Sequence, residues 1–231
     1  MQGNQVRTVL GIFAKEPRPG GVKSRLAATI GPERAAQVYD AFLRDLLERL
    51  RDFKARRAVA YSPPSAGDFF RTLVGDAFEL EPQSAGDLGQ RMLVFFEREF
   101  AAGAGRVVLI GSDSPDLPLD RIDHAFRLLE NHELVLGPCD DGGYYLIGMS
   151  RLIPEMFAGI DWSTPAVFEQ TMRQAGTLSV RTALLDRWYD VDDPKDLRRL
   201  AANLSIAADD STVAASLPHT VAMLRLLADL L

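Results

Sequence analysis

Two short acidic segments carry the residues whose types and spacing could bind a cation. Asp113 and Asp116 follow the apolar run 106–111, and Asp190 and Asp192 flank a single valine much later in the chain. Such an apolar run predicts an interior strand of a parallel sheet, and open α/β sheets bind ligands at the carboxyl ends of their strands. In an extended segment, Asp190 and Asp192 project to the same side. We therefore expect Asp113, Asp190 and Asp192 to hold Mg²⁺ or Mn²⁺, because these hard ions prefer carboxylate and phosphate oxygens.

Helix capping is the alternative explanation of the same aspartates. In the Ser-Asp-x-Pro segment, capping of the following helix accounts for Asp113 and Asp116 as well as metal binding does. Near the second segment, Asp192 or Asp193 is expected to cap a helix ahead of Pro194 even if the other is a ligand. Both interpretations stay open for each segment.

A loop rich in cations and glycine follows the first predicted strand, residues 6–14. Between positions 14 and 26 the chain holds four lysine or arginine residues and two glycines. Glycine allows close backbone approach to a phosphate group, and lysine and arginine neutralise its charge. The residues expected to contact a nucleotide phosphate are Ala14, Lys15, Gly20, Lys23 and Arg25. The spacing matches neither Walker A nor Gly-x-Gly-x-x-Gly, and a solvated basic loop is the alternative.

A glycine pair between two aspartates and two tyrosines joins two further predicted strands. A plain turn explains this segment, because Asp-Gly is a frequent turn dipeptide. A floor for an acceptor explains it equally, with Gly142, Gly143 and Tyr144 beneath the acceptor and Asp141 as the candidate base. Both hypotheses stay open.

Other polar residues have simpler expected roles. Gln83 ends a predicted strand, and reading of a nucleotide base is one hypothesis for it, whereas Asp87 is expected to cap the next helix. Trp162 is expected to serve packing. The single cysteine, Cys139, lies beside two aspartates, whose charges raise the pKa of its thiol and disfavour a nucleophilic role. The three histidines lack the spacing of a zinc site.

Short β-rich runs alternate with helical periodicity along the chain. Strands are predicted at residues 6–14, 58–61, 77–80, 107–110, 134–136, 144–149 and 178–184. Helices are predicted at residues 32–50, 87–102, 118–130, 164–174 and 195–202, with a short one ending near residue 73. The second of these is expected to bury Leu88, Met92, Phe95 and Phe96. The alternation predicts a Rossmann-like, three-layer α/β fold with a mostly parallel mixed sheet, in which residues 144–149 run antiparallel.

One domain over residues 1–204 accounts for this pattern. A loop at 205–216 and an amphipathic helix at 221–231 follow, and we expect the helix to pack on the same domain or on a partner subunit, as in a homodimer. The net charge of −6 argues against non-specific nucleic-acid binding. The lone cysteine fits a reducing cytoplasm, and no apolar run has the length of a secretory signal or a membrane span.

Four motifs, in order along the chain, resemble one bacterial family. They are Phe13-Ala14-Lys15-x-Pro17-x-Pro19-Gly20-x-Val22-Lys23-Ser24-Arg25-Leu26, Gly111-Ser112-Asp113-Ser114-Pro115-Asp116-Leu117-Pro118, Gly137-Pro138-x-Asp140-Asp141-Gly142-Gly143-Tyr144-Tyr145-Leu146-Ile147-Gly148 and Asp190-Val191-Asp192-x-Pro194-x-Asp196-Leu197. Over residues 6–200 the chain is similar to the provisionally named nucleotide-diphospho-sugar transferases called rSAM/selenodomain-associated transferase 1, which have the A-type glycosyltransferase fold. The resemblance implies a nucleotide at the first loop and Asp113 as the metal-binding aspartate. Two features depart from the family pattern: Ser24 stands where threonine is frequent, and the segment that begins at Asp113 lacks the Asp-x-Asp spacing of glycosyltransferases.

The same superfamily contains nucleotidyltransferases, including 2-phospholactate guanylyltransferase, that share the Ser-Asp-x-Pro segment and the late Asp-x-Asp. The resemblance therefore implies a metal-dependent transferase that uses a nucleotide-activated donor, in the first instance a nucleotide-diphospho-sugar, and a small acceptor. Lys15, Lys23 and Arg25 would neutralise the phosphate charge that the metal leaves. A nucleotidyltransferase that releases pyrophosphate is one alternative, and a non-catalytic nucleotide-binding protein is the other.

Overall fold

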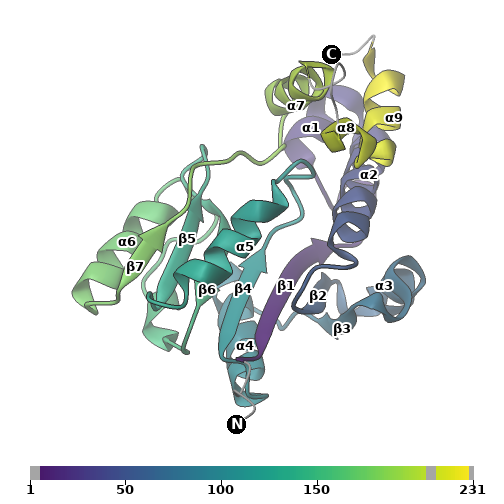
Figure 1. Cartoon of the computed structure of the whole chain (residues 1–231). Coiled ribbons are helices and arrows are strands. Elements are labelled where there is room, and N and C mark those ends of the chain that lie inside the picture. Colours follow the sequence, from purple (N-terminus) through teal and green to yellow (C-terminus); the bar gives the residue numbers. More distant parts are fainter. Residues whose placement is uncertain (1–5, 207–211, 229–231) are drawn as a thin grey trace.

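Figure 1 shows the computed structural model, which describes residues 6–206 and 212–228, as a central sheet with helices on both sides. The sheet has seven strands in the order β3-β2-β1-β4-β6-β5-β7. Their bounds are β1 Thr8–Lys15, β2 Arg56–Ser62, β3 Glu79–Pro82, β4 Arg106–Ile110, β5 Leu134–Pro138, β6 Tyr144–Met149 and β7 Thr182–Leu184. Neighbouring strands of this sheet are parallel, except that β6 runs antiparallel to both β4 and β5. The predicted mixed sheet, with its antiparallel strand at 144–149, is confirmed.

The helices form one layer on each face of the sheet and a third group beyond the strand ends. Their bounds are α1 Ser24–Ile30, α2 Pro32–Leu50, α3 Gly67–Val74, α4 Leu88–Ala101, α5 Leu119–Leu128, α6 Val167–Thr177, α7 Pro194–Ile206, α8 Thr212–Ala215 and α9 Pro218–Leu226, with 3₁₀ turns at Pro64–Ala66, Gly75–Ala77 and Pro154–Phe157. Side chains of α2, α3 and α5 pack on one face, and those of α4 and α6 on the other. Helices α1, α7 and α9 share a third cluster with α2. In the part of the chain described here, no helix combines the length and the apolar character needed to cross a membrane.

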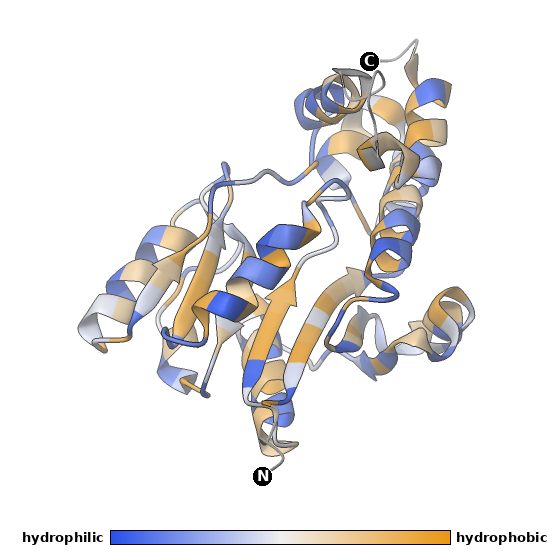
Figure 2. Cartoon of the chain, in the orientation of Figure 1, coloured by the Kyte–Doolittle hydropathy of each residue, from blue (hydrophilic) through white to orange (hydrophobic). Residues whose placement is uncertain are grey.

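Strand β4 shows how the sequence places the sheet inside the molecule. Val107 and Leu109 pack toward α4, whereas Val108 and Ile110 pack toward α2 and α5. Because side chains alternate along a strand, an unbroken apolar run is buried on both faces. Figure 2 shows most of the ribbon of β4 and of its neighbour β1 in the orange of hydrophobic residues. Polar residues begin only after Gly111, where the chain leaves the sheet.

Two local predictions are confirmed. Asp87 caps α4, accepting a hydrogen bond from the backbone N–H of Gln90 at 2.9 Å, while the Gln90 side chain accepts one from the backbone N–H of Asp87. Trp162 serves packing, because its ring stacks on Phe157 and lies directly against Gly89 of α4. Both residues therefore act in the scaffold.

Three other predictions about elements need correction. Helix α1 begins at Ser24, inside the segment expected to be loop, because Leu26 and Ile30 find buried positions in the α1-α2-α7-α9 cluster. Leu88 is 40% exposed, and it is the first residue of α4, directly after the cap residue Asp87. Helix α8 lies within the expected loop 205–216, whose residues 207–211 are outside the described residues. Residues 1–5 and 229–231 are also outside the described residues, and the latter are the end of the expected amphipathic helix.

Helix α9 is joined to α2 by a buried carboxylate. Asp45, in α2, is 1% exposed and accepts hydrogen bonds from the backbone N–H groups of His219 at 3.1 Å and Thr220 at 2.6 Å. These N–H groups belong to the first turn of α9 and have no acceptor within the helix. Leu217 and Leu227, at the two ends of α9, are buried in the same cluster as residues of α2. The last described helix thus docks on α2 of its own chain.

Replacing Asp45 with alanine should lower the free energy of unfolding by about 1–3 kcal/mol, because two N–H groups at the start of α9 lose their acceptor. Urea denaturation followed by circular dichroism measures this change. The exposed Asp52, just after α2, gives the matched control, and Asp52→Ala should change the stability by less than about 0.5 kcal/mol. Equal effects of the two substitutions would contradict the docking role of Asp45.

Candidate functional site

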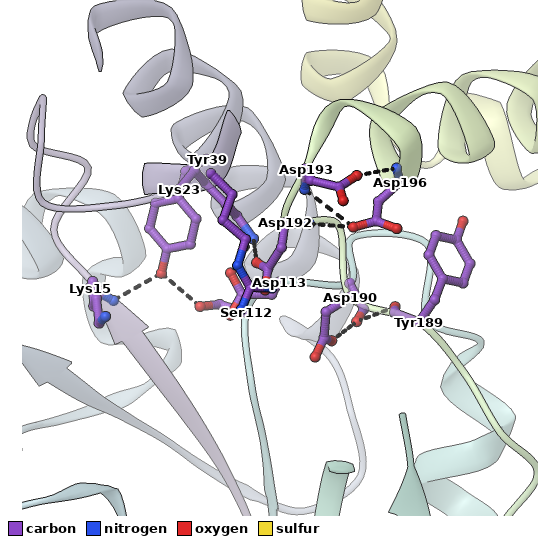
Figure 3. Close-up of polar contacts among 12 residues, drawn as sticks. Lys15, Lys23, Tyr39, Ser112, Asp113, Tyr189, Asp190, Asp192, Asp193 and Asp196 are labelled. Carbon is purple, nitrogen blue, oxygen red and sulfur yellow. Dashed lines mark hydrogen bonds and ion pairs between the residues drawn. The ribbon is translucent and has the colours of Figure 1, made fainter. Parts of the chain in front are cut away.

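Three segments meet at the carboxyl ends of β1 and β4, and Figure 3 shows their side chains: the loop after β1, the turn after β4 and the chain entering α7. Lys23 Nζ, from the first segment, donates hydrogen bonds to Asp113 Oδ1 and, at 3.0 Å, to Asp192 Oδ1. Arg25 Nη1 lies 3.9 Å from Asp192 Oδ2. The backbone N–H of Val191 donates to the carbonyl of Asp113 at 3.0 Å. The structure thus brings four of the predicted site residues together.

Lys23 is buried although its partners face solvent. Its side chain is 2% exposed, against 43% for Asp113 and 40% for Asp192. It lies just before α1 in the left-handed region, at φ 49°, and its ammonium lies 5.8 Å and 6.0 Å from the ring centres of Tyr39 and Phe42. Burial lowers the pKa of Lys23, but the charges of Asp113 and Asp192 outweigh burial and hold this pKa above the usual lysine value. Lys23 is therefore a fixed positive charge beneath two carboxylates.

Tyr39 of α2 joins the ends of β1 and β4. Its hydroxyl accepts a hydrogen bond from the backbone N–H of Lys15 at 2.9 Å and forms another with Ser112 Oγ at 2.7 Å. Burial, followed by the charge of Asp113, raises the pKa of Tyr39 to about 12, so the hydroxyl keeps its proton near neutral pH. Sequence reasoning missed this bridge. The available signal was that a buried tyrosine hydroxyl needs a hydrogen-bond partner.

Asp190 lies beside this group and has partners of its own. Its Oδ1 accepts a hydrogen bond from Ser114 Oγ at 2.7 Å, and its Oδ2 accepts one from Cys139 Sγ at 3.3 Å. Burial, with the charge of Asp113 second, raises the pKa of Asp190 to about 6. Burial and the charge of Asp190 also raise the pKa of the Cys139 thiol. The charges of Asp141 and Asp140 raise this pKa further, as the sequence predicted. Asp190 and Asp192 therefore do not share their contacts.

Helix capping explains Asp193 and not Asp113 or Asp192. The Asp193 carboxylate accepts hydrogen bonds from two backbone N–H groups in the first turn of α7, at 2.7 Å and 3.0 Å. The start of α5 has no side-chain cap. The buried carboxylate of Asp116 accepts a hydrogen bond from the Tyr189 hydroxyl instead. The two half-exposed carboxylates of Asp113 and Asp192 thus cap no helix and pair with Lys23.

The donor set at this rim fits a hard divalent cation. Within residues 6–206 and 212–228, one set of three potential ligand atoms lies within 4.8 Å of one another, from Cys139, Asp141 and Asp190. The expected trio of three aspartates is not such a set, and a protonated thiol is a poor ligand for Mg²⁺. Asp113 and Asp192, in contrast, offer carboxylate oxygens that already share one cation, the ammonium of Lys23. These two residues would hold Mg²⁺ or Mn²⁺, with phosphate oxygens as further ligands.

The glycine turn after β5 packs closely against the segment before α6. Asp141 Oδ1 accepts a hydrogen bond from the backbone N–H of Gly143 at 2.9 Å. Gly142 has φ +91°, and a Cβ atom there would overlap the carbonyl group of Pro165. The Tyr144 ring packs against the cluster beneath α4 and α6, and its hydroxyl is buried. The turn geometry thus accounts for Gly142, whereas contact of Asp141 or Gly143 with an acceptor stays a prediction.

In the segment expected to bind phosphate, the side chains that contact Asp113 or Asp192 are those of Lys23 and Arg25. Exposed positions there are Lys15, Gly20 and Arg25, and Ala14 is buried in β1. Gln83 donates from its amide group to the carbonyl oxygens of Ala60 at 2.8 Å and Ala14 at 3.5 Å, so it connects the ends of β2 and β1. Reading of a nucleotide base by Gln83 stays a prediction.

Tyr39→Phe should lower the free energy of unfolding by about 1–3 kcal/mol, because the partly buried backbone N–H group of Lys15 and the buried Ser112 hydroxyl lose their shared partner. Ser112→Ala removes one arm of the same bridge. If the bridge acts as one unit, the double variant loses less stability in urea than the sum of the single variants. Strict additivity would contradict a shared network.

Gly142→Ala should destabilise the protein more than Gly20→Ala. Both glycines have positive φ, which costs a non-glycine residue about 1–3 kcal/mol. A Cβ at Gly20 meets open space, whereas one at Gly142 meets the backbone of Pro165, so the second variant carries an additional steric cost of about 1–3 kcal/mol. Thermal unfolding compares the two variants, and equal losses would show that the turn does not pack on Pro165.

Comparison with known proteins gives matches over most of the chain. The family model described as "Uncharacterized protein conserved in bacteria (DUF2064)" matches residues 46–164. The 3-phospho-D-glycerate guanylyltransferase of Phenylobacterium zucineum (strain HLK1) is 29% identical over 197 residues, covering 78% of this chain and 84% of that protein. A crystal structure from Desulfovibrio desulfuricans G20, of a provisionally named nucleotide-diphospho-sugar transferase, is 32% identical with a TM-score of 0.85, covering 95% of this chain and 97% of that one.

A more distant structure shares the fold. The cytidylyltransferase from Leptospira borgpetersenii serovar Hardjo-bovis (strain JB197) is 15% identical with a TM-score of 0.55, covering 97% of this chain and 96% of that one. The three proteins are named as a guanylyltransferase, a nucleotide-diphospho-sugar transferase and a cytidylyltransferase. Asp113 lies within the family match, and Lys23 and Asp192 lie on either side of it. The family match and the 32% identity along nearly the whole chain show that this protein belongs to the bacterial family DUF2064.

Proposed function

We propose that the protein is a metal-dependent nucleotidyltransferase, which joins the nucleoside monophosphate unit of an NTP to a small phosphorylated acceptor. The observation that carries the proposal is the convergence of Asp113 and Asp192 on Lys23 at the carboxyl ends of β1 and β4. Open α/β sheets bind ligands at that edge. The guanylyltransferase relative supports nucleotidyl transfer as the reaction.

The chain's own residues would bind and orient the phosphate groups. Lys23 is held at this rim before any substrate arrives, so its ammonium lies within reach of the phosphate groups and would stabilise negative charge that develops on the leaving group. Lys15, at the end of β1, and Arg25, in the first turn of α1, are exposed and would neutralise further phosphate oxygens. Mg²⁺ or Mn²⁺, held by Asp113 and Asp192, would when bound supply additional positive charge to the phosphate chain.

With a phosphorylated acceptor, the reaction exchanges one phosphoanhydride bond for another. A phosphate oxygen of the acceptor forms a bond to the α-phosphorus of the NTP, the bond from that phosphorus to its bridging oxygen breaks, and pyrophosphate leaves. An acceptor phosphate needs no base, because it is already ionised near neutral pH. A hydroxyl acceptor needs one, and exposed Asp141 is the candidate for it.

Sugar transfer from a nucleotide-diphospho-sugar is the second candidate. The Desulfovibrio structure that bears this name matches almost the whole chain. Against it, the turn after β4 has the sequence Asp-Ser-Pro-Asp and not the Asp-x-Asp of glycosyltransferases. The products separate the two reactions, because a nucleotidyltransferase releases pyrophosphate from an NTP whereas a glycosyltransferase releases NDP or NMP.

Asp113→Asn and Asp192→Asn should each lower kcat at least about 100-fold, because each removes a carboxylate charge at the phosphate site and nearly preserves the side-chain shape. The assay measures pyrophosphate release from the four NTPs with Mg²⁺ and a panel of phosphorylated hydroxy acids. Asp76→Asn, which removes an exposed charge far from the site, is the control and should retain wild-type activity.

Each other outcome has a definite meaning. Release of NDP from a nucleotide sugar, with no pyrophosphate from any NTP, would replace nucleotidyl transfer by sugar transfer. A rise in Tm with an NTP and Mn²⁺ but no turnover of any donor would indicate a non-catalytic nucleotide-binding protein. Wild-type activity in both aspartate variants would refute the proposed site.

A further inference from the structure

We propose that Lys23 occupies the cation position between Asp113 and Asp192 until a nucleotide arrives, so that the protein binds a divalent metal weakly by itself and tightly only together with a nucleotide. The inference rests on the proposed function and adds an order of binding to it. Three observations carry it: the identity of the shared oxygens, the side from which the ammonium reaches them, and the balance of charge.

The first observation is that one ammonium uses both carboxylates at once. Lys23 Nζ donates to Asp113 Oδ1 and to Asp192 Oδ1. A hard cation at this rim would bind the same two carboxylates. A second positive charge that binds the same two oxygens is repelled by the ammonium next to it. Metal binding therefore competes with the Lys23 ion pairs.

The second observation is that Lys23 approaches from the protein side and leaves the solvent side open. The Lys23 side chain is 2% exposed, whereas both carboxylates are about 40% exposed, at 43% and 40%. The rings of Tyr39 and Phe42 lie beneath the ammonium. A phosphate group that enters from solvent can reach the same rim and offer its oxygens to Lys23. The ammonium then needs to move only from a carboxylate to a phosphate oxygen.

The third observation is that the charges do not balance without a further cation. One ammonium faces the two carboxylates of Asp113 and Asp192. Arg25 adds only a distant partner, 3.9 Å from Asp192, with a side chain that is 72% exposed. The remaining negative charge attracts a divalent ion, yet Lys23 already binds one oxygen of each carboxylate. Nucleotide phosphate removes this conflict, because it accepts Lys23 and supplies metal ligands at the same time.

By linkage, a nucleotide that tightens metal binding is itself bound more tightly in the presence of the metal, by the same factor. Couplings of this kind typically amount to about 5–150-fold. Lys23 thus has two successive partners in the scheme: two aspartates in the free protein, and the phosphate chain in the complex. Its buried stem and fixed backbone hold the ammonium within reach of both.

The test measures Mn²⁺ binding to the full chain without any nucleotide, by the electron paramagnetic resonance signal of free Mn²⁺. Lys23→Met keeps the length and apolar stem of the side chain and removes the competing charge. We expect this variant to bind Mn²⁺ at least about tenfold more tightly than wild type. Lys23→Arg restores a cation and should bind Mn²⁺ as weakly as wild type does.

Arg25→Met is the matched control for the general loss of one positive charge. Its guanidinium lies near Asp192 but does not bridge the two carboxylates, so its loss should tighten Mn²⁺ binding less than about threefold. Lys23→Gln repeats the measurement with a neutral polar side chain, should Lys23→Met fail to fold. Equal effects of Arg25→Met and Lys23→Met would overturn the inference.

Unchanged or weaker Mn²⁺ binding in both neutral Lys23 variants would also overturn it. Two further variants separate this failure from that of the proposed function. If Asp113→Asn and Asp192→Asn abolish Mn²⁺ binding while the Lys23 variants do not tighten it, the metal site stands and only the role of Lys23 fails. If the aspartate variants bind Mn²⁺ like wild type, the metal site fails, and with it the proposed function.

Discussion

A buried ammonium between two carboxylates is the interaction on which the arrangement of the site depends. Lys23 pairs with residues 90 and 169 positions away along the chain, so three separate segments must arrive together before its charge is balanced. A lysine that lost water without gaining these partners would favour its neutral form. The charge of Lys23 thus links the loop after β1, the turn after β4 and the entry to α7.

The scaffold makes this convergence possible through strand order and one tyrosine. Strands β1 and β4 are parallel neighbours, so their carboxyl ends and the loops that follow them lie side by side. Tyr39 joins the two ends from α2, with one hydroxyl that contacts the backbone of the first loop and Ser112, next to Asp113. Helix α2, on which α9 docks, therefore contacts the site through the Tyr39 side chain.

Relatives with different named reactions share this scaffold, which agrees with the general rule that a fold does not fix a function. A guanylyltransferase and a provisionally named nucleotide-diphospho-sugar transferase match the chain at similar identity, 29% and 32%. Both chemistries handle a phosphate chain and a leaving group that gains negative charge. A fixed cation beside two carboxylates serves either of them, so the acceptor side must distinguish the reactions. The turn of Gly142, which is predicted to lie on the acceptor side, packs closely on Pro165.

The sequence alone determined the sheet, its antiparallel strand, the cap at Asp87 and the position of Asp113 at a strand end, because these follow from local periodicity and capping chemistry. The sequence did not predict helix α1, because its apolar residues are too few to establish a helical periodicity and become buried only against α2 and α7. Nor could it separate Asp192, which meets Lys23, from Asp190, which meets Ser114 and Cys139. Period-two alternation places side chains on a face, but the partner that each finds is decided by segments far away in the chain. Only the tertiary structure brings those segments together, and it alone made Lys23 a buried charge.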